Sequence, residues 1–270
     1  LNIICENWDA LVLGDYDYVM PILHHEKFKR NIIFSSRLGN RLGIFSNKIL
    51  NNEIVTAFIN QIPVKFQLIN LLLNKFNKLN QKTSTLKTYE MDLIRSYMKS
   101  TEKYSNHFHK CIHIAVSKRM SVIQAITPNE LIHFAYKKNS TANPRLNASD
   151  LQKLRMIIAY GIRYNLVEMY GAYTAENNLC AAALFMKSKR KIHLIFNAIS
   201  KEGLESFALH YLIDKFIESH SEKTLTLNIE NVIVHNDMDF FSGVGAHEYQ
   251  YKRYYVNRLP WYCKFLIKIN

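Results

Sequence analysis

The sequence predicts an α+β fold in which a mixed, mostly antiparallel twisted sheet is flanked by helices. The chain has 270 residues, 48% of them hydrophobic, so it can bury a substantial core. Runs typical of strands alternate with segments of helical periodicity along the chain. In the second half, short turn-forming segments separate three successive strand-like runs, which favours antiparallel pairing.

The first third of the chain predicts a small sheet with one helix. Two apolar runs flank the turn-forming dipeptide Gly14-Asp15, which is typical of a β-hairpin. Pro63 is expected to end the helix before it, and the polar segment after residue 73 separates this part from the rest. In chain order we expect a hairpin over residues 8–23, a strand over 31–34, a helix over 51–62 and a strand over 64–73.

The middle of the chain predicts mainly helices. Thr127-Pro128-Asn129-Glu130 combines a threonine N-cap, proline at the first helical position and glutamate at the third, which together make a capping box. After the polar segment 139–147, Ser149 is the expected cap of a further helix that runs to about Tyr164. Before these two helices we expect a strand over 85–93, one long helix over 94–118 and a short strand over 120–126.

The most informative segment is residues 165 to 256. Glu176-Asn177-Asn178 and residues 187–190 are turn-like, so the runs around them predict an antiparallel meander. The order β-β-β-α-β-α-β follows, with strands at 166–174, 179–186, 191–199, 225–229 and 249–256 and helices at 204–220 and 237–242.

Composition predicts a cytoplasmic protein in a reducing compartment. The four cysteines are widely spaced and form no CxxC pair, which argues against a zinc ribbon and a disulfide scaffold. No apolar run approaches the ~20 residues needed to cross a bilayer, so no integral membrane segment is expected. The formal net charge of +13 suits an anionic partner, but the Lys and Arg residues are scattered rather than gathered into a nucleic-acid footprint. The chain enters an apolar stretch directly at Leu1, so we expect the natural start to be missing.

Several strings in the sequence resemble those of one family. The chain is similar to the GNAT fold as elaborated in Fem-type (FemAB-like) acyltransferases and their uncharacterised bacterial relatives. This resemblance implies tandem GNAT-like domains: a partial, N-terminally truncated domain over residues 1–84 and an acyltransferase domain over residues 85–270. The segment 228–232 departs from the Asp-Phe-Glu-Gly-Ser pattern expected there. The strings that carry the resemblance are Trp8-Asp9-Ala10, Leu42–Ser46, Ala181–Phe185, His193–Ala198, Phe240–Ala246 and Asn257–Trp261.

The resemblance also implies where an acyl donor lies. In a GNAT-like fold the donor is held where two neighbouring parallel strands splay, here residues 191–199 and 225–229. Backbone groups of Ile195, Asn197 and Ile199 are then expected to pair with a pantetheine amide. The donor diphosphate is expected near Lys201 and the helix that begins at Gly203. An ordinary capped helix after a strand is the alternative interpretation of the Ser200–Gly203 segment.

Transfer to an amine requires a base to remove its proton and an acid to protonate the leaving group. Glu230, at the end of the penultimate strand, is the first candidate for the base. Tyr249 and Tyr251, near the final strand, are candidates for the acid. Each has a plain alternative, because strand-end glutamates are usually solvated and alternating tyrosines usually pack on a sheet face.

The run from His107 to His113 is the candidate metal site, but its predicted helical conformation makes it a weak one. On a helix only His109 and His113 face each other, at i and i+4, and no third ligand is in sight. We therefore expect no metal.

Three functions stay open on this sequence. The first is transfer of an acyl group from acyl-CoA to an amine on a small molecule, a peptide or a cell-envelope precursor. The second keeps the reaction but takes the group from aminoacyl-tRNA, as a Fem-type peptide ligase. The third is a noncatalytic binding protein that retains the GNAT fold.

Overall fold

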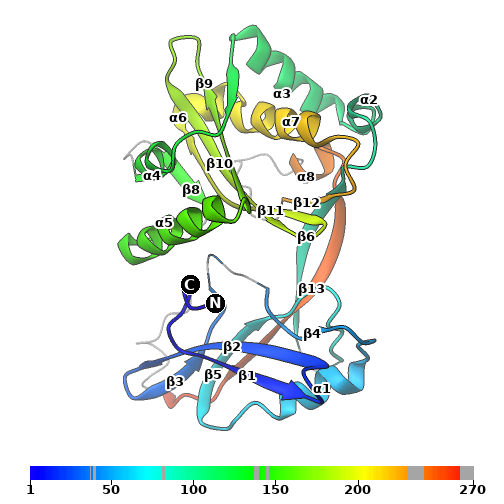
Figure 1. The fold of residues 1–270 in the computed structure, drawn as a ribbon, viewed down its shortest axis with the longest axis vertical. Coiled ribbons are helices and arrows are strands. Elements are labelled where there is room, and N and C mark those ends of the chain that lie inside the picture. The colour runs from blue at the N-terminus through cyan, green and yellow to red at the C-terminus, as the bar shows by residue number, and fades with distance from the viewer. Residues whose placement is uncertain are drawn as a thin grey trace. The chain divides into compact units, whose positions relative to one another are not determined.

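The structure, a computed structural model, forms two compact units. It describes residues 1–36, 38, 41–80, 83–136, 140–143 (backbone only), 146–229 and 240–261. Unit 1 contains residues 1–87 together with the described part of the C-terminal segment that begins at Gln250, and unit 2 contains Thr88–Tyr249. Two strands, β6 and β13, pass from one unit to the other (Figure 1). The domain boundary predicted between residues 84 and 85 stays a prediction, because compact units are not by themselves evolutionary domains.

In the described residues of unit 1, helix α1 packs on a sheet. The strand order is β1-β2-β3-β5-β13, with β4 paired to β2. β3 and β5 are parallel, whereas the hairpin β1–β2 and the pair β5–β13 are antiparallel. The elements are β1 (Trp8–Leu13), β2 (Tyr18–Lys27), β3 (Arg30–Ile33), β4 (Phe45–Ser46), α1 (Asn52–Asn60), β5 (Phe66–Leu72) and β13 (His247–Asn257).

Unit 2 contains the larger sheet, in the order β6-β12-β11-β10-β9-β7, with β8 paired to β11. The pair β11–β12 is parallel and its neighbours are antiparallel. The strands are β6 (Ser84–Asp92), β7 (Ser121–Gln124), β8 (Ser140–Asn143), β9 (Val167–Tyr173), β10 (Leu179–Ser188), β11 (Lys191–Ser200) and β12 (Thr226–Asn228). The helices are α2 (Tyr97–Thr101), α3 (Asn106–Ser117), α4 (Pro128–Tyr136), α5 (Ala148–Arg163), α6 (Lys201–Glu205), α7 (Ala208–His220) and α8 (Phe240–Gly243).

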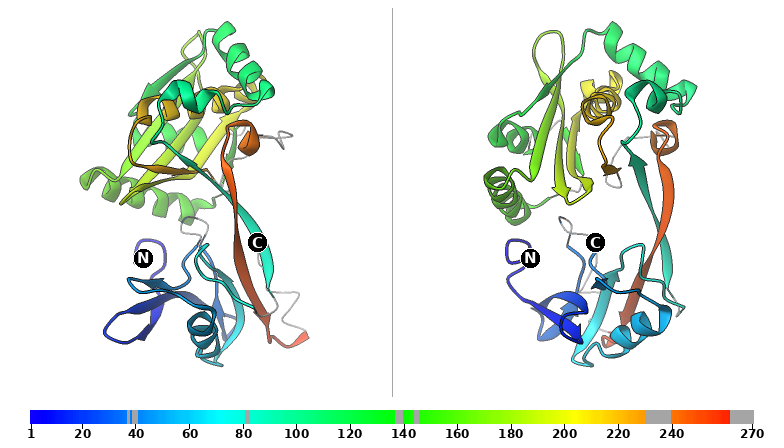
Figure 2. Two further views of the ribbon diagram at one scale, coloured as in Figure 1. Left: turned by 90° about the vertical axis from the view of Figure 1, so that its right-hand side faces the viewer. Right: turned by 45° about the vertical axis from the view of Figure 1, so that its right-hand side comes forward.

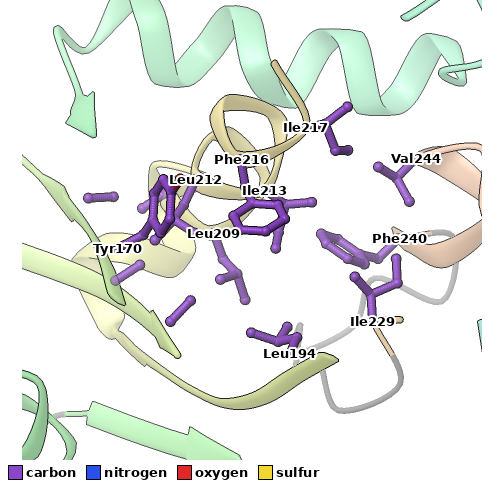
Figure 3. Packing of buried hydrophobic residues seen from close by; sticks show 14 of the residues in the cluster. Tyr170, Leu194, Leu209, Leu212, Ile213, Phe216, Ile217, Ile229, Phe240 and Val244 are labelled. Carbon is purple, nitrogen blue, oxygen red and sulfur yellow. The ribbon is translucent and has the colours of Figure 1, made fainter. Parts of the chain in front are cut away.

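Helices cover both faces of the unit 2 sheet. α3 and α7 lie on one face, and α4 and α5 lie on the other (Figures 1 and 2). α7 supplies the centre of the core, where Phe216 stacks on Phe185 of β10 with ring centroids 3.8 Å apart. Leu194 of β11 and Ile229, just after β12, point into the same core (Figure 3). Burial of this apolar surface is the main favourable contribution to the folding of unit 2.

The predicted fold class is confirmed: the sheet is mixed, mostly antiparallel and flanked by helices. The β1–β2 hairpin is also found, and the second half follows the predicted order except that its first helix is divided into α6 and α7. α4 begins as predicted, because Glu130 N–H donates to Thr127 Oγ1 at 3.2 Å and Thr127 N–H donates to Glu130 Oε2 at 2.8 Å. Among the described helices, none is both long and apolar enough to span a membrane.

Two predicted helices are each divided in the structure. The helix predicted over residues 94–118 is α2 and α3, because Ser105 Oγ accepts a hydrogen bond from Phe108 N–H and caps a new helix. The helix predicted over residues 204–220 is α6 and α7, with Phe207 between them in the left-handed region at φ 54°. Periodicity missed both breaks because the apolar spacing continues across them.

Two local predictions around α5 are wrong. Its cap is Asn147 rather than Ser149: Asn147 Oδ1 accepts from Asp150 N–H at 2.8 Å and Asp150 completes a capping box. The polar segment predicted over 139–147 contains the strand β8. Its composition of small and polar residues gave no strand signal, and its pairing to β11 is a tertiary contact.

Candidate functional site

Within the part of the chain that the structure describes, β11 and β12 pair in parallel over a short stretch. Their register covers three residues of β11, from Lys191 to His193, opposite Thr226 to Asn228. On the other side of β11, Leu184 of β10 faces Phe196 and the next residue, Phe185, faces Leu194, so Ile195 is skipped by the register. This is a β-bulge, and bulges bend a strand and frequently lie beside functional sites. The predicted acyl-donor site would lie where the described pairing of these two parallel strands ends, and its role stays a prediction.

Beyond the bulge, the free side of β11 is taken by β8. Asn197–Ser200 pair antiparallel with Asn143–Ser140, and Asn197–Ile199 also pair with β10 on their other side. Of the three residues predicted to pair with pantetheine, Asn197 and Ile199 thus lie between two strands. Ile195 lies between the end of the β12 pairing and the start of the β8 pairing.

The segment predicted to hold the donor diphosphate forms the short helix α6. Ser200 is its N-cap, and Ser200 Oγ accepts a hydrogen bond from Gly203 N–H at 3.0 Å. Gly203 faces the sheet, since a Cβ added there would lie 2.2 Å from the carbonyl oxygen of Cys180. Lys201 points outward, with 86% of its side chain exposed and its Nζ 4.0 Å from Glu205. Lys201 is therefore accessible to an anion, whereas Gly203 serves close packing of α6 on β10.

The three candidates for proton transfer lie in different settings. Glu230 is outside the described residues. Tyr249 is 40% exposed, whereas Tyr251 is 7% exposed and the Arg41 guanidinium lies 5.0 Å from its ring centroid. The division between the two units falls between these tyrosines. Their roles remain predictions.

A buried polar cluster that the sequence analysis missed lies where β6, β12 and β11 meet. Glu90 of β6 is 5% exposed and accepts a hydrogen bond from Lys191 Nζ at 3.0 Å. Asn228 Nδ2 donates to Thr88 Oγ1 at 3.0 Å and lies 3.5 Å from Glu90 Oε1. The cluster therefore joins the last paired residue of β12 to the first residue of β11, at the base of the divergence. The available signal was a charged residue, Glu90, between Tyr89 and Met91 in a predicted strand.

A second polar cluster lies at the far side of α7. Glu168 of β9 accepts hydrogen bonds from Lys187 Nζ, from Tyr170 Oη at 3.2 Å and from His220 Nε2 at 3.2 Å. Burial by itself would raise the pKa of Glu168, but the hydrogen bonds and charges of His220 and Lys187 outweigh it and lower the pKa to about 2. The carboxylate is thus held ionised as part of an ion-pair network.

Tyr170 and Ser219 connect this second cluster to a pocket of about 420 Å³ between β7 and α7. Polar side chains that line the pocket interact with one another: Lys215 Nζ lies 2.6 Å from Glu218 Oε2 and 5.5 Å from the ring centroid of Tyr211. The pocket lies beside the outermost strand of the sheet, several strands from the divergence of β11 and β12. We take the divergence as the candidate site, since it has the geometry for an extended donor.

The histidine run from His107 lies on α3, as predicted. Cys111 Sγ is 3.5 Å from His107 Nε2, one helical turn away. Within the described ranges, no three His, Cys, Asp or Glu side chains gather in a way that could hold a metal ion.

The chain has the fold of several solved structures at very low sequence identity. FemX matches with a TM-score of 0.56 and 11% identity, over 92% of this chain and 88% of FemX. L-PGS from Bacillus licheniformis matches with a TM-score of 0.53 and 9% identity, over 96% of this chain and 87% of L-PGS. The C-terminal domain (DUF2156) of a putative lysylphosphatidylglycerol synthetase from Agrobacterium fabrum matches with a TM-score of 0.58 and 7% identity, over 96% of this chain and 86% of that domain.

The predicted Fem-like GNAT fold is confirmed by these structures. No protein-family model matches the sequence, and no curated protein matches it. Identities near 10% show a shared fold and leave the reaction to be argued from the site.

Proposed function

We propose that this chain, built on the Fem-like fold, transfers an acyl group to an amine where β11 and β12 diverge. The observation that carries the proposal is that the described parallel pairing covers three residues of β11 and is followed by the bulge at Ile195. A strand that leaves its parallel neighbour turns backbone N–H and C=O groups toward the opening, and these can bind an extended amide-bearing ligand. The acceptor we propose is an amine on a small molecule, a peptide or a cell-envelope precursor.

Acyl-CoA is the donor that we propose first. Its pantetheine arm carries amides that suit the backbone of Ile195, Asn197 and Ile199. Lys201 is exposed beside the end of β11, where a diphosphate would follow, and the N-cap Ser200 begins α6 there. The excess of 35 Lys and Arg over 22 Asp and Glu also favours an anionic donor.

The chemistry requires two proton movements. The acceptor ammonium must lose a proton before its nitrogen attacks the thioester carbonyl, and the leaving thiolate must gain one. We propose Glu230 for the first step and Tyr249 or Tyr251 for the second. The buried cluster of Glu90, Lys191 and Asn228 would hold the neighbouring ends of β11 and β12 in place during both proton transfers.

Aminoacyl-tRNA is the second candidate donor, as in Fem-type ligases. The observation that favours it is β8, which covers the part of the β11 edge that a pantetheine arm needs. A noncatalytic binding protein on the same fold is the third candidate, and the departure of the 228–232 segment from the family pattern favours it.

Calorimetric titration with acetyl-CoA and CoA tests the donor. We expect saturable binding that is weakened several-fold in Lys201→Glu, because the substitution places a negative charge beside the diphosphate. Lys110→Glu makes the same charge change on the exposed surface of α3 and should bind like the unmodified chain. Equal weakening in both variants would point to overall charge rather than to a site at Lys201.

Measuring the transfer of a labelled group distinguishes the three candidate functions. Glu230→Gln should abolish transfer of a labelled acetyl group to an amine while leaving the thermal midpoint unchanged. Label transfer that requires aminoacyl-tRNA and ignores acetyl-CoA would select the second donor. Ligand binding without transfer from either donor, in a folded protein, would select the noncatalytic candidate.

A further inference from the structure

The donor edge of β11 carries a strand of the same chain. The register pairs Asn197 with Asn143, Ala198 with Ala142, Ile199 with Thr141 and Ser200 with Ser140. β10 lies along the opposite side of this part of β11, so both edges are occupied. An edge pairs with one extended partner at a time, because each backbone N–H and C=O that points outward takes one place in a ladder. A pantetheine arm and β8 therefore compete for Asn197 and Ile199.

The covering strand is short, and it contacts α4 as well as β11. β8 has four residues, whereas the pairing of β10 with β11 extends from Ala181 to Ser188. Pro144 comes next in the sequence and has no N–H with which to extend the ladder. A ladder of four residues has few hydrogen bonds to break, as a displaceable strand requires.

We propose that β8 is a self-inhibitory strand that occupies the donor edge of β11 and is displaced when the donor binds. This inference rests on the proposed function, since it assigns the regulation of the same site. The covered state lowers the apparent donor affinity in proportion to the fraction of molecules in which the edge is open. Any partner that draws residues 140–143 away from β11 would then activate the protein.

A pair of prolines tests release of the strand. Neighbouring residues of a strand direct their N–H groups to opposite edges, so replacing both Thr141 and Ala142 removes the ladder bond whichever edge each faces. We expect Thr141→Pro/Ala142→Pro to bind CoA about tenfold more tightly than the unmodified chain in calorimetry. Thr141→Val/Ala142→Val retains both N–H groups and should show no gain.

A reversible disulfide tests the opposite change. Ala142 and Ala198 are register partners, and directly opposed Cβ atoms lie about 4.5–5.5 Å apart, close enough for a disulfide with a small adjustment. We expect oxidised Ala142→Cys/Ala198→Cys to bind CoA at least about tenfold more weakly than the same protein after reduction. Each single cysteine variant, treated with the same oxidant, controls for the native thiols.

The CoA affinities of these variants test the inhibitory role of β8 separately from the assignment of CoA as the donor. If the unmodified chain and every folded variant bind CoA equally well, β8 is no inhibitor, while the proposed function stands. If no variant binds CoA even with the two prolines in place, the inhibitory role and the CoA assignment both fail. Binding that appears only in the proline variant supports both proposals.

Discussion

Two carboxylates of unit 2, the buried Asp214 and the half-buried Glu168, show how neighbouring groups decide the direction in which a pKa shifts. Asp214 of α7 accepts hydrogen bonds from the neutral hydroxyls of Tyr97 at 2.9 Å and Tyr104 at 3.2 Å. Burial dominates there and raises the pKa of Asp214. Glu168 is also withdrawn from water, but the His220 and Lys187 side chains hold its pKa at about 2. The His220 and Lys187 partners of Glu168 therefore account for the opposite directions of the two pKa shifts.

Glu168→Gln should destabilise the protein at neutral pH. The folded-state pKa of about 2 lies below the ordinary value of 4.5, so the stabilisation is complete above about pH 5 and is lost as pH falls toward 2. Allowing for its partial exposure, we expect a loss of roughly 2 kcal/mol in unfolding free energy at pH 7. Urea denaturation at pH 7 and pH 3 should show a smaller acid-induced loss in the variant than in the unmodified chain.

Glu176→Gln is the matched control, because Glu176 is exposed in the turn between β9 and β10. It should leave both the stability and its pH dependence close to those of the unmodified chain. Identical pH dependence for Glu168→Gln and Glu176→Gln would show that the Glu168 network contributes nothing to stability.

The elements around the divergence depend on one close approach. α6 lies so near β10 that the position of Gly203 admits no side chain without displacing the backbone at Cys180. A bulky residue at this position would disturb the sheet as well as the site, so it cannot serve as a simple block of donor binding. A charge change at the exposed Lys201 avoids this disturbance of the sheet.

Gly203→Ala should cost about 2 kcal/mol in unfolding free energy, because the added methyl group meets backbone rather than a movable side chain. Gly243→Ala in α8 is the comparison: the nearest atom to its added Cβ is the Ser105 Oγ at 3.1 Å, which can shift. We expect a much smaller loss there. Denaturant titration of both variants measures the difference, and equal losses would contradict the packing argument.

At the scale of the whole molecule, the excess of positive charge makes the salt dependence of binding a way to distinguish the two candidate donors. The formal net charge is +13, and its attraction for an anion is screened by salt. We expect CoA binding to weaken by less than about tenfold between 50 and 200 mM salt, since CoA presents few phosphates. Aminoacyl-tRNA held through many phosphates would lose roughly a thousandfold over the same range. Anisotropy titrations with each labelled donor measure both slopes, and a steep, tRNA-like slope with no CoA binding would replace the first donor by the second.

Local chemistry was sufficient to predict much of this architecture. The capping box at Thr127 and Glu130, the turn at Gly14 and the periodicity of the second-half strands act over a few residues, so they can be read directly from the chain. The family resemblance predicts a donor site along residues 191–199, where the described residues show a parallel pairing of three residues and a bulge, and the site stays a prediction. The roles of Glu230, Tyr249 and Tyr251 stay predictions.

The remaining features depend on contacts between residues far apart in the chain. Glu90 meets Asn228 and Lys191 only because β6, β12 and β11 pair, and nothing within each strand predicts that cluster. β8 is a strand because β11 offers it an edge, since its own residues have weak strand propensity. Propensity and caps are properties of short segments, whereas buried polar clusters and edge pairing arise when the sheet assembles. The sequence by itself therefore determined the framework of helices and strands, and the assembled sheet determined which side chains meet in polar clusters and which strand lies along the edge of β11.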